Sequence, residues 1–139
     1  MAVEVVINYW AVLVATIAAQ VIGFLWYGPL FGKLWIKLSG FTDLDMAKAR
    51  EKGMAKSYIL NFIASLVTAY VLAHFVDYVG AASFGTALQL AFWLWLGFIV
   101  PVMLGIVIWE GKPARLYILN IVHYLISLVV MSVILALWI

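Results

Sequence analysis

Four long apolar runs divide this 139-residue chain, and its charged residues are confined to the segments outside them. Crossing the hydrocarbon core of a bilayer takes about 20 residues of helix, because the backbone there must satisfy its own hydrogen bonds. Each run is about that long and contains no Asp, Glu, Lys or Arg. The pattern predicts an all-α membrane protein, a single transmembrane domain 1–139 with four transmembrane helices at 5–27, 58–76, 84–109 and 116–139.

The polar segment 28–57 carries the signals of two further helices. Its apolar residues recur at helical spacing over 30–38, with Lys33 and Lys37 on another side, which indicates an amphipathic helix in the cytoplasmic interface. Gly40 then fits a helix C-cap. Thr42 and Asp45 have capping-box spacing, so a short polar helix is expected from there to Lys52.

Proline positions predict two changes in the spans. Gly28-Pro29 is expected to end the first span, because proline lacks an N–H and disfavours a helical residue before it. Pro101 lies inside the third run, where it should remove one backbone hydrogen bond and kink the helix.

The distribution of basic residues predicts the orientation. All eight lie in two segments, six in 28–57 and two, Lys112 and Arg115, between the third and fourth runs. Cytoplasmic loops carry an excess of Lys and Arg, so this bias predicts that both termini lie outside. It also argues against antiparallel dimers of mixed insertion.

Composition excludes several classes of protein. Apolar residues make up 68% of the chain and charged residues 10%, against roughly half and a quarter in soluble domains. The net charge of +2 is too small to argue for nucleic acid as a partner. Because the chain has no cysteine, it can form neither a disulfide nor a thiolate metal site.

A short repeat suggests internal symmetry. Tyr58-Ile-Leu-Asn61 opens the second run and Tyr117-Ile-Leu-Asn120 opens the fourth. One interpretation is a 2+2 parallel repeat, with two hairpins related by an axis along the membrane normal. The other is chance similarity between apolar segments.

Each predicted span also carries polar or small residues at helical spacing. Polar side chains within a bilayer face protein or water, so these stripes should converge on the bundle interior or on a subunit interface. They serve either as packing contacts or as the lining of a wet interior. His123 is the best single candidate for chemistry, because histidine titrates near neutral pH. The candidate intramembrane polar site comprises Gln20, Asn61, Ser65, Thr68, Gln89, Asn120, His123, Tyr124 and Ser127.

No set of residues with catalytic or metal-binding spacing appears. His74 and Asp77 are three residues apart on one helix, but two ligands are too few for a metal site. The chain also lacks nucleophile-elbow, zinc-protease and phosphate-loop motifs. We therefore expect no enzyme activity, no catalytic residue, no metal and no cofactor.

Several motifs resemble those of a known family. They are Trp26-Tyr-Gly-Pro-Leu-Phe-Gly-Lys33, Phe92-Trp-Leu-Trp-Leu-Gly-Phe98, Glu110-Gly-Lys-Pro113, and Asn120 with His123-Tyr124. The chain is similar in these to a prokaryotic family of small four-span integral membrane proteins of unknown function. The resemblance implies a multi-pass protein of the prokaryotic cell (inner) membrane. It implies no activity and no catalytic residue.

Two functions remain open. The slightly favoured one is a homo-oligomer that mediates ion or small-solute permeation through a polar helix-bundle interior. The alternative is a non-catalytic accessory or scaffold subunit that binds membrane lipids or a protein partner through the basic segment 30–56. The candidate lipid or partner surface comprises Lys33, Trp35, Lys37, Lys48, Arg50, Lys52 and Lys56.

Overall fold

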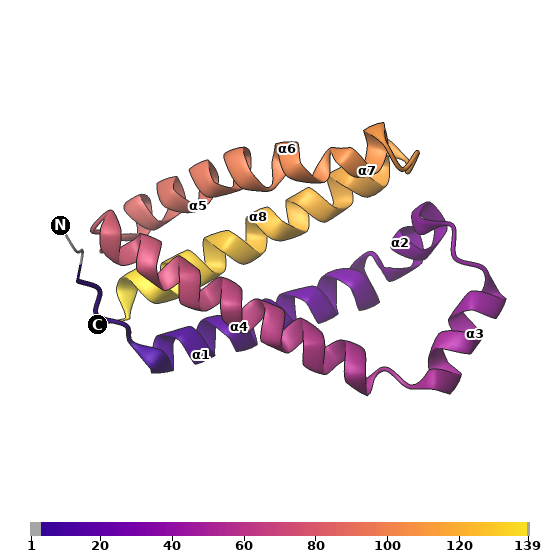
Figure 1. Cartoon of the computed structure of the whole chain (residues 1–139), viewed down its shortest axis with the longest axis horizontal. Helices are drawn as coiled ribbons and strands as arrows, with labels where there is room; N and C mark the ends of the chain where they lie inside the picture. Colours follow the sequence, from indigo (N-terminus) through magenta and orange to yellow (C-terminus); the bar gives the residue numbers. More distant parts are fainter. Residues whose placement is uncertain (1–3, 139) are drawn as a thin grey trace.

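The structure, a computed structural model, describes residues 4–138 and is all-α (Figure 1). Four stretches of helix, 22 to 25 residues long, are apolar enough to cross a membrane. They coincide with the four apolar runs of the sequence, and most of their boundaries differ from the predicted ones by a few residues.

The first span begins later and ends later than predicted. It consists of α1 (Tyr9–Leu25) and a π-helical turn, η1 (Trp26–Leu30). The helix starts at Tyr9 because the Asn8 side chain caps it, accepting a hydrogen bond from the Ala11 N–H at 3.2 Å. The predicted stop at Gly28-Pro29 is wrong, because the helix widens by one residue there and passes through Pro29.

The second and fourth spans are continuous helices, α4 (Ala55–Tyr78) and α8 (Ala114–Leu137). The third span is interrupted, as Pro101 predicts. It comprises α5 (Phe84–Phe98), α6 (Val100–Met103) and α7 (Gly105–Ile108), with breaks at Ile99 and Leu104.

The segment between the first two spans forms the two expected helices. They are α2 (Gly32–Ser39) and α3 (Asp43–Lys52). Gly40 has a φ of +80°, the left-handed conformation that glycine adopts at helix C-caps. The capping box at Thr42 is complete, because the Asp45 N–H donates to Thr42 Oγ1 and the Thr42 N–H donates to Asp45 Oδ2.

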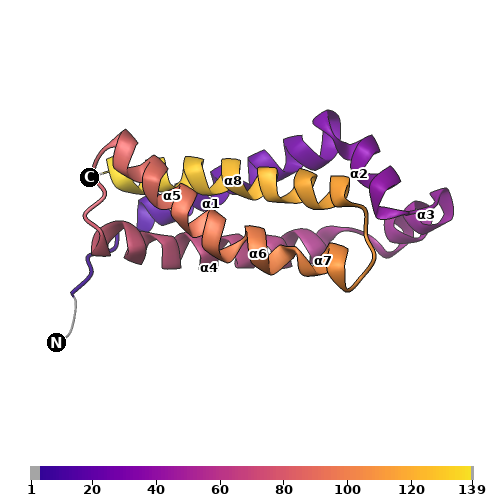
Figure 2. The same ribbon diagram turned by 90° about the horizontal axis from the view of Figure 1, so that it is seen from above.

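The fourth span is the centre of the bundle. Helix α8 packs against α1, α4 and α5, and α1 also packs against α4 (Figure 2). Where α1, α4 and α8 meet, the core includes Val12 and Ala15 of α1, Ala69 and Leu72 of α4, and Met131 of α8. The alanines let the backbones approach closely, which is the usual way that helices associate in membranes.

The bundle has one basic end. The described chain begins and finishes at the opposite end, whereas α2, α3, the start of α4 and the α7–α8 turn lie together (Figure 1). We call this second end the basic end, because it holds all eight Lys and Arg residues. It also holds four of the six acidic residues, which leaves it a formal net charge of +4.

Candidate intramembrane polar site

The π-helical turn η1 reshapes the first span where it nears the basic end. Pro29 has no N–H to donate to a carbonyl one turn back, and the Phe31 N–H instead donates to Trp26 O, five residues earlier, at 2.9 Å. Gly32 is needed beside this turn, because a Cβ there would lie 2.8 Å from the Tyr27 carbonyl oxygen. Turns of this kind often occur at functional sites.

The turn brings aromatic side chains of the first span against α8. Tyr27 donates a hydrogen bond from its hydroxyl to Asn120 Oδ1 at 2.7 Å. The His123 ring lies 4.9 Å from the Tyr27 ring and 5.0 Å from the Tyr124 ring, measured between centroids, and the Trp26 ring is 6.2 Å away. We call these residues, with Ser127, the His123 cluster.

Two polar atoms of this cluster lack partners. Within residues 4–138, Trp26 Nε1 and His123 Nδ1 are buried and make no hydrogen bond. The other ring nitrogen of His123, Nε2, lies 3.4 Å from Ser127 Oγ, a long contact. A buried polar atom left unpaired costs about 1–3 kcal/mol, so two in one cluster call for a physical explanation.

A second polar cluster joins α1 to α4. Gln20 donates from Nε2 to Ser65 Oγ at 2.7 Å and to the Asn61 carbonyl oxygen at 3.3 Å. Asn61 donates from Nδ2 back to Gln20 Oε1 at 3.1 Å. These three bonds satisfy most of the polar atoms involved. We call this group the α1–α4 cluster, and its geometry fits a packing contact between helices.

The remaining candidate polar residues stand apart from both clusters. Thr68 lines a groove between α4 and α5, and its hydroxyl donates to Ala64 O of its own helix at 3.0 Å. Gln89 is exposed on α5, and so are the residues that follow it at intervals of four along the third span, Trp93, Gly97 and Pro101. That stripe therefore faces away from the bundle interior of a single chain.

Three residues outside the predicted set also bridge helices in this region. Trp95 donates from Nε1 to the Ile121 carbonyl oxygen at 2.6 Å, and the Tyr117 hydroxyl donates to the Val100 carbonyl oxygen beside Pro101. Tyr27 is the third. Tyr27 and Tyr117 both lie near predicted span ends, where aromatic residues are common at the membrane interface. The periodicity of the first span also places Tyr27 in line with Gln20, on one face of the helix, which is the signal for its second role.

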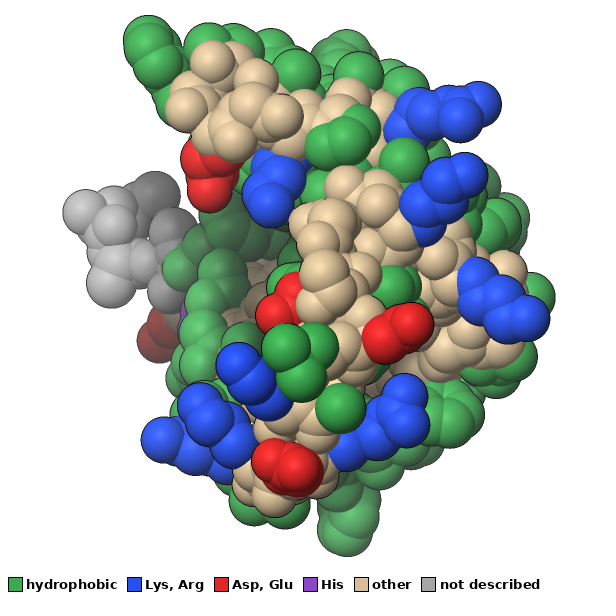
Figure 3. Space-filling view, turned by 90° about the vertical axis from the view of Figure 1, so that its right-hand side faces the viewer, with side chains coloured by type: hydrophobic (Ala, Val, Ile, Leu, Met, Phe, Trp, Pro, Cys, Tyr) green, Lys and Arg blue, Asp and Glu red, His purple; other side chains and the backbone are tan. Residues whose placement is uncertain are grey.

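The candidate lipid or partner surface lies at the basic end, where all six of its Lys and Arg side chains are exposed. Helix α3 buries none of its residues. Trp35 of α2 is half-buried, with its ring 5.6 Å from that of Tyr27 and 5.5 Å from that of Phe41. Lys112 ties the α7–α8 turn to α2 by donating to the Ser39 carbonyl oxygen at 3.4 Å. Figure 3 shows this end, with Lys and Arg side chains spread across it.

One carboxylate at this end has a shifted pKa. The Thr42 backbone N–H, and next the Thr42 hydroxyl, hold the pKa of Asp45 below its usual value.

As for metals, the described part of the chain contains no group of three or more His, Asp or Glu residues that could hold an ion.

Helix length and hydropathy define the class: this is a small multi-pass integral membrane protein with four candidate membrane-spanning helices. Its family follows from comparison with known proteins. Residues 10–136 match the family described as Protein of unknown function (DUF1761), and the chain belongs to that family. Neither a curated protein nor a solved structure matches it.

Proposed function

We propose that this protein is a non-catalytic accessory or scaffold subunit of a prokaryotic cell membrane, whose segment 30–56 binds anionic lipid headgroups or an acidic partner at the cytoplasmic surface. The observation that carries the proposal is α3, a helix that buries no side chain and presents Lys48, Arg50 and Lys52 to solvent. Clusters of four to eight Lys and Arg next to a transmembrane helix are typical of anionic-lipid recognition.

The amphipathic α2 supports the same function. Its aromatic side faces Tyr27 and Phe41, whereas Lys33 and Lys37 are exposed. A helix of this kind lies in the interface plane, so it would hold α3 close to the headgroups. The positive-inside rule puts such a basic segment on the cytoplasmic side.

The test uses the absence of cysteine in the chain. An Ala49→Cys variant is labelled with a polarity-sensitive fluorophore and reconstituted into phosphatidylglycerol or phosphatidylcholine vesicles. We expect the label on α3 to report a less polar environment in phosphatidylglycerol, and 1 M salt should abolish the difference, because the Debye length then falls to about 3 Å. Equal signals in both lipids, with no acidic protein co-purifying, would overturn the proposal.

Homo-oligomeric permeation of an ion or small solute is the second candidate, and the His123 cluster favours it. Trp26 Nε1 and His123 Nδ1, which are buried and have no hydrogen-bond partner among the described residues, offer two polar atoms at one place within the membrane. An intramembrane histidine is a functional candidate by default. The groove between α4 and α5 supplies no polar path beside this cluster, because its lining is apolar apart from Thr68.

Flux in proteoliposomes separates the two candidates. Permeation predicts solute or ion flux above that of protein-free vesicles, and its loss in His123→Ala but not in Val21→Ala, which changes an apolar side chain exposed on α1. Flux no higher than that of protein-free vesicles, from a folded and inserted protein, excludes this second candidate and leaves the first untouched.

A further inference from the structure

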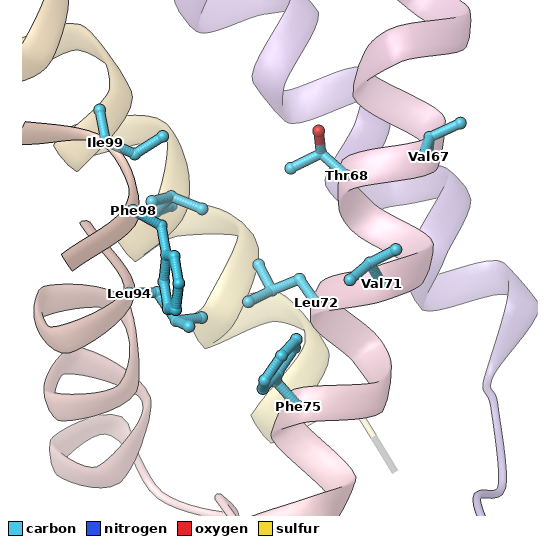
Figure 4. A pocket seen from close by; sticks show the side chains of 9 residues that line it. Val67, Thr68, Val71, Leu72, Phe75, Leu94, Phe98 and Ile99 are labelled. Carbon is cyan, nitrogen blue, oxygen red and sulfur yellow. The ribbon is translucent and has the colours of Figure 1, made fainter. Parts of the chain in front are cut away.

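An apolar groove opens between α4 and α5. The short connection 79–83 joins these helices at one end of the bundle, and they diverge toward the basic end (Figure 1). A cavity of about 410 Å³ lies between them, with Leu128 of α8 at its floor. Figure 4 shows Leu72 and Phe75 of α4 across the gap from Leu94 and Phe98 of α5.

The lining of the groove selects hydrocarbon. Eight of the nine lining side chains are apolar, and the ninth, Thr68, donates its hydroxyl to Ala64 O. The groove's only side-chain donor is therefore already used, and the Thr68 oxygen is the one side-chain acceptor among the lining residues. Val71 and Phe98 are 46% and 68% exposed, so the groove is open at the surface of the bundle.

The near edge of the groove lies within reach of an acyl chain from the leaflet at the basic end. Val67 lies eleven residues beyond Lys56 on α4, or about 16 Å of helix. Ile99, on the other wall, lies nine residues before Ile108, or about 14 Å. One leaflet is half of the roughly 30 Å hydrocarbon core, about 15 Å, so a chain anchored at the basic end reaches the near edge of the cavity, at Val67 and Ile99.

The charges at the mouth of the groove select an anionic headgroup. Lys52 and Lys56 lie at the α4 side, and Lys112 and Arg115 lie around the α7–α8 turn, which also carries Glu110. Figure 3 shows Lys and Arg side chains on both sides of a hollow with hydrophobic walls. Basic pockets between transmembrane helices on the cytoplasmic side bind anionic headgroups. A second copy of the chain in the same orientation would instead place its own basic end, with a formal net charge of +4, beside this one, and the like charges would repel.

We propose that the groove between α4 and α5 binds one anionic phospholipid, with an acyl chain along the groove and the headgroup between the start of α4 and the α7–α8 turn. The inference rests on the proposed function only for the contact of the basic end with anionic lipid. It adds a defined site, a bound stoichiometry of one, and a hydrocarbon contact that the surface helices do not supply.

The experiment is native mass spectrometry of the full-length protein, released from vesicles of equal phosphatidylglycerol and phosphatidylcholine. The wild type should retain one phosphatidylglycerol. Val71→Trp fills the groove and should reduce the lipid-bound fraction at least about tenfold, a change equivalent to roughly 1.4 kcal/mol. Val21→Trp is the matched control, since Val21 is 52% exposed on α1, and it should retain the lipid.

A pair of charge variants separates this inference from the proposed function. Lys52→Gln with Lys56→Gln should remove the preference for phosphatidylglycerol over phosphatidylcholine, while Lys33→Gln with Lys37→Gln should keep it. Retention of lipid by Val71→Trp, or equal losses in the two double variants, overturns the groove site and leaves surface binding by segment 30–56 standing. A wild-type dimer that Val71→Trp dissociates identifies a second copy as the occupant and also overturns it.

Discussion

Replacing Gln20 with leucine should weaken the contact between α1 and α4 more than any other single polar deletion in the spans. Gln20 takes part in three interhelical hydrogen bonds, to Ser65 Oγ, to the Asn61 carbonyl oxygen and from Asn61 Nδ2. Within residues 4–138, every other polar side chain of the spans takes part in fewer interhelical hydrogen bonds. Gln20→Leu keeps an apolar side chain of similar size, so the change isolates the polar contribution.

The magnitude follows from the number of bonds. Interhelical hydrogen bonds in membranes contribute about 0.6 kcal/mol on average and at most about 1.7 kcal/mol. Three bonds therefore predict a loss of about 2 kcal/mol in the free energy of unfolding. A double-mutant cycle of Gln20→Leu with Ser65→Ala should give a coupling of about 0.6–1.7 kcal/mol, because it isolates the 2.7 Å bond.

The assay is reversible unfolding in mixed micelles with increasing SDS, followed by circular dichroism. Gln89→Leu is the matched control, because Gln89 is exposed on α5 and lies outside both clusters. Its effect should stay within about 0.5 kcal/mol. If Gln20→Leu costs no more than Gln89→Leu, or if the cycle gives no coupling, the α1–α4 cluster is not the contact described.

Three other predictions test separate parts of the structure. Tyr27→Phe should lower the free energy of unfolding by about 0.6–1.7 kcal/mol by removing the bond to Asn120, measured in the same assay, whereas Tyr124→Phe should change it by less. Pro101→Ala should restore a backbone N–H in the third span and slow amide hydrogen exchange over residues 99–105, and unchanged exchange would show that the breaks do not depend on proline. The pKa of Asp45 is lowered in the folded chain, so its capping contribution is complete above the ordinary aspartate pKa of about 3.9 and is lost as the pH falls through the lowered value. Amide exchange in α3 should accelerate over that acidic range, and Asp45→Asn should remove the pH dependence.

Local signals in the sequence predicted the small helices well. Gly40 specifies the end of α2 by its left-handed backbone conformation, and the Thr42–Asp45 pair specifies the start of α3 by side-chain capping. Both predictions are confirmed. The error at Pro29 has an equally local cause. A helix that meets a proline can either end there or continue through a wider, π-helical turn. Which of the two occurs at Pro29 depends on how the first span packs against α8, and the sequence does not reveal that packing.

The arrangement of the spans in the bundle could not be predicted from the sequence. The third span (α5–α7) and the fourth span (α8) have mean hydropathies of 2.4 and 2.3, yet 6% of the most apolar stretch of the third and 39% of that of the fourth is buried. In water, burial and hydropathy rise together, but lipid is as apolar as a protein core. Hydropathy therefore cannot identify α8 as the central helix.

The sequence predicted which polar residues lie within the spans, but it did not predict which of them contact one another. Periodicity placed Gln20 on one stripe and His123 on another, and the structure assigns them to different clusters. Which stripe meets which depends on helix neighbours and rotation. For the same reason the sequence did not connect Trp26 with His123, although both lie in its most distinctive motifs.

The central claim is that the basic end, with its surface helices and the mouth of the groove, faces the cytoplasm. Because the chain lacks cysteine, single-cysteine variants report orientation without background. In intact cells a membrane-impermeant maleimide should label Gly80→Cys and leave Lys48→Cys and Lys112→Cys unlabelled until the membrane is opened. Labelling of Lys48→Cys or Lys112→Cys from outside intact cells would contradict the account.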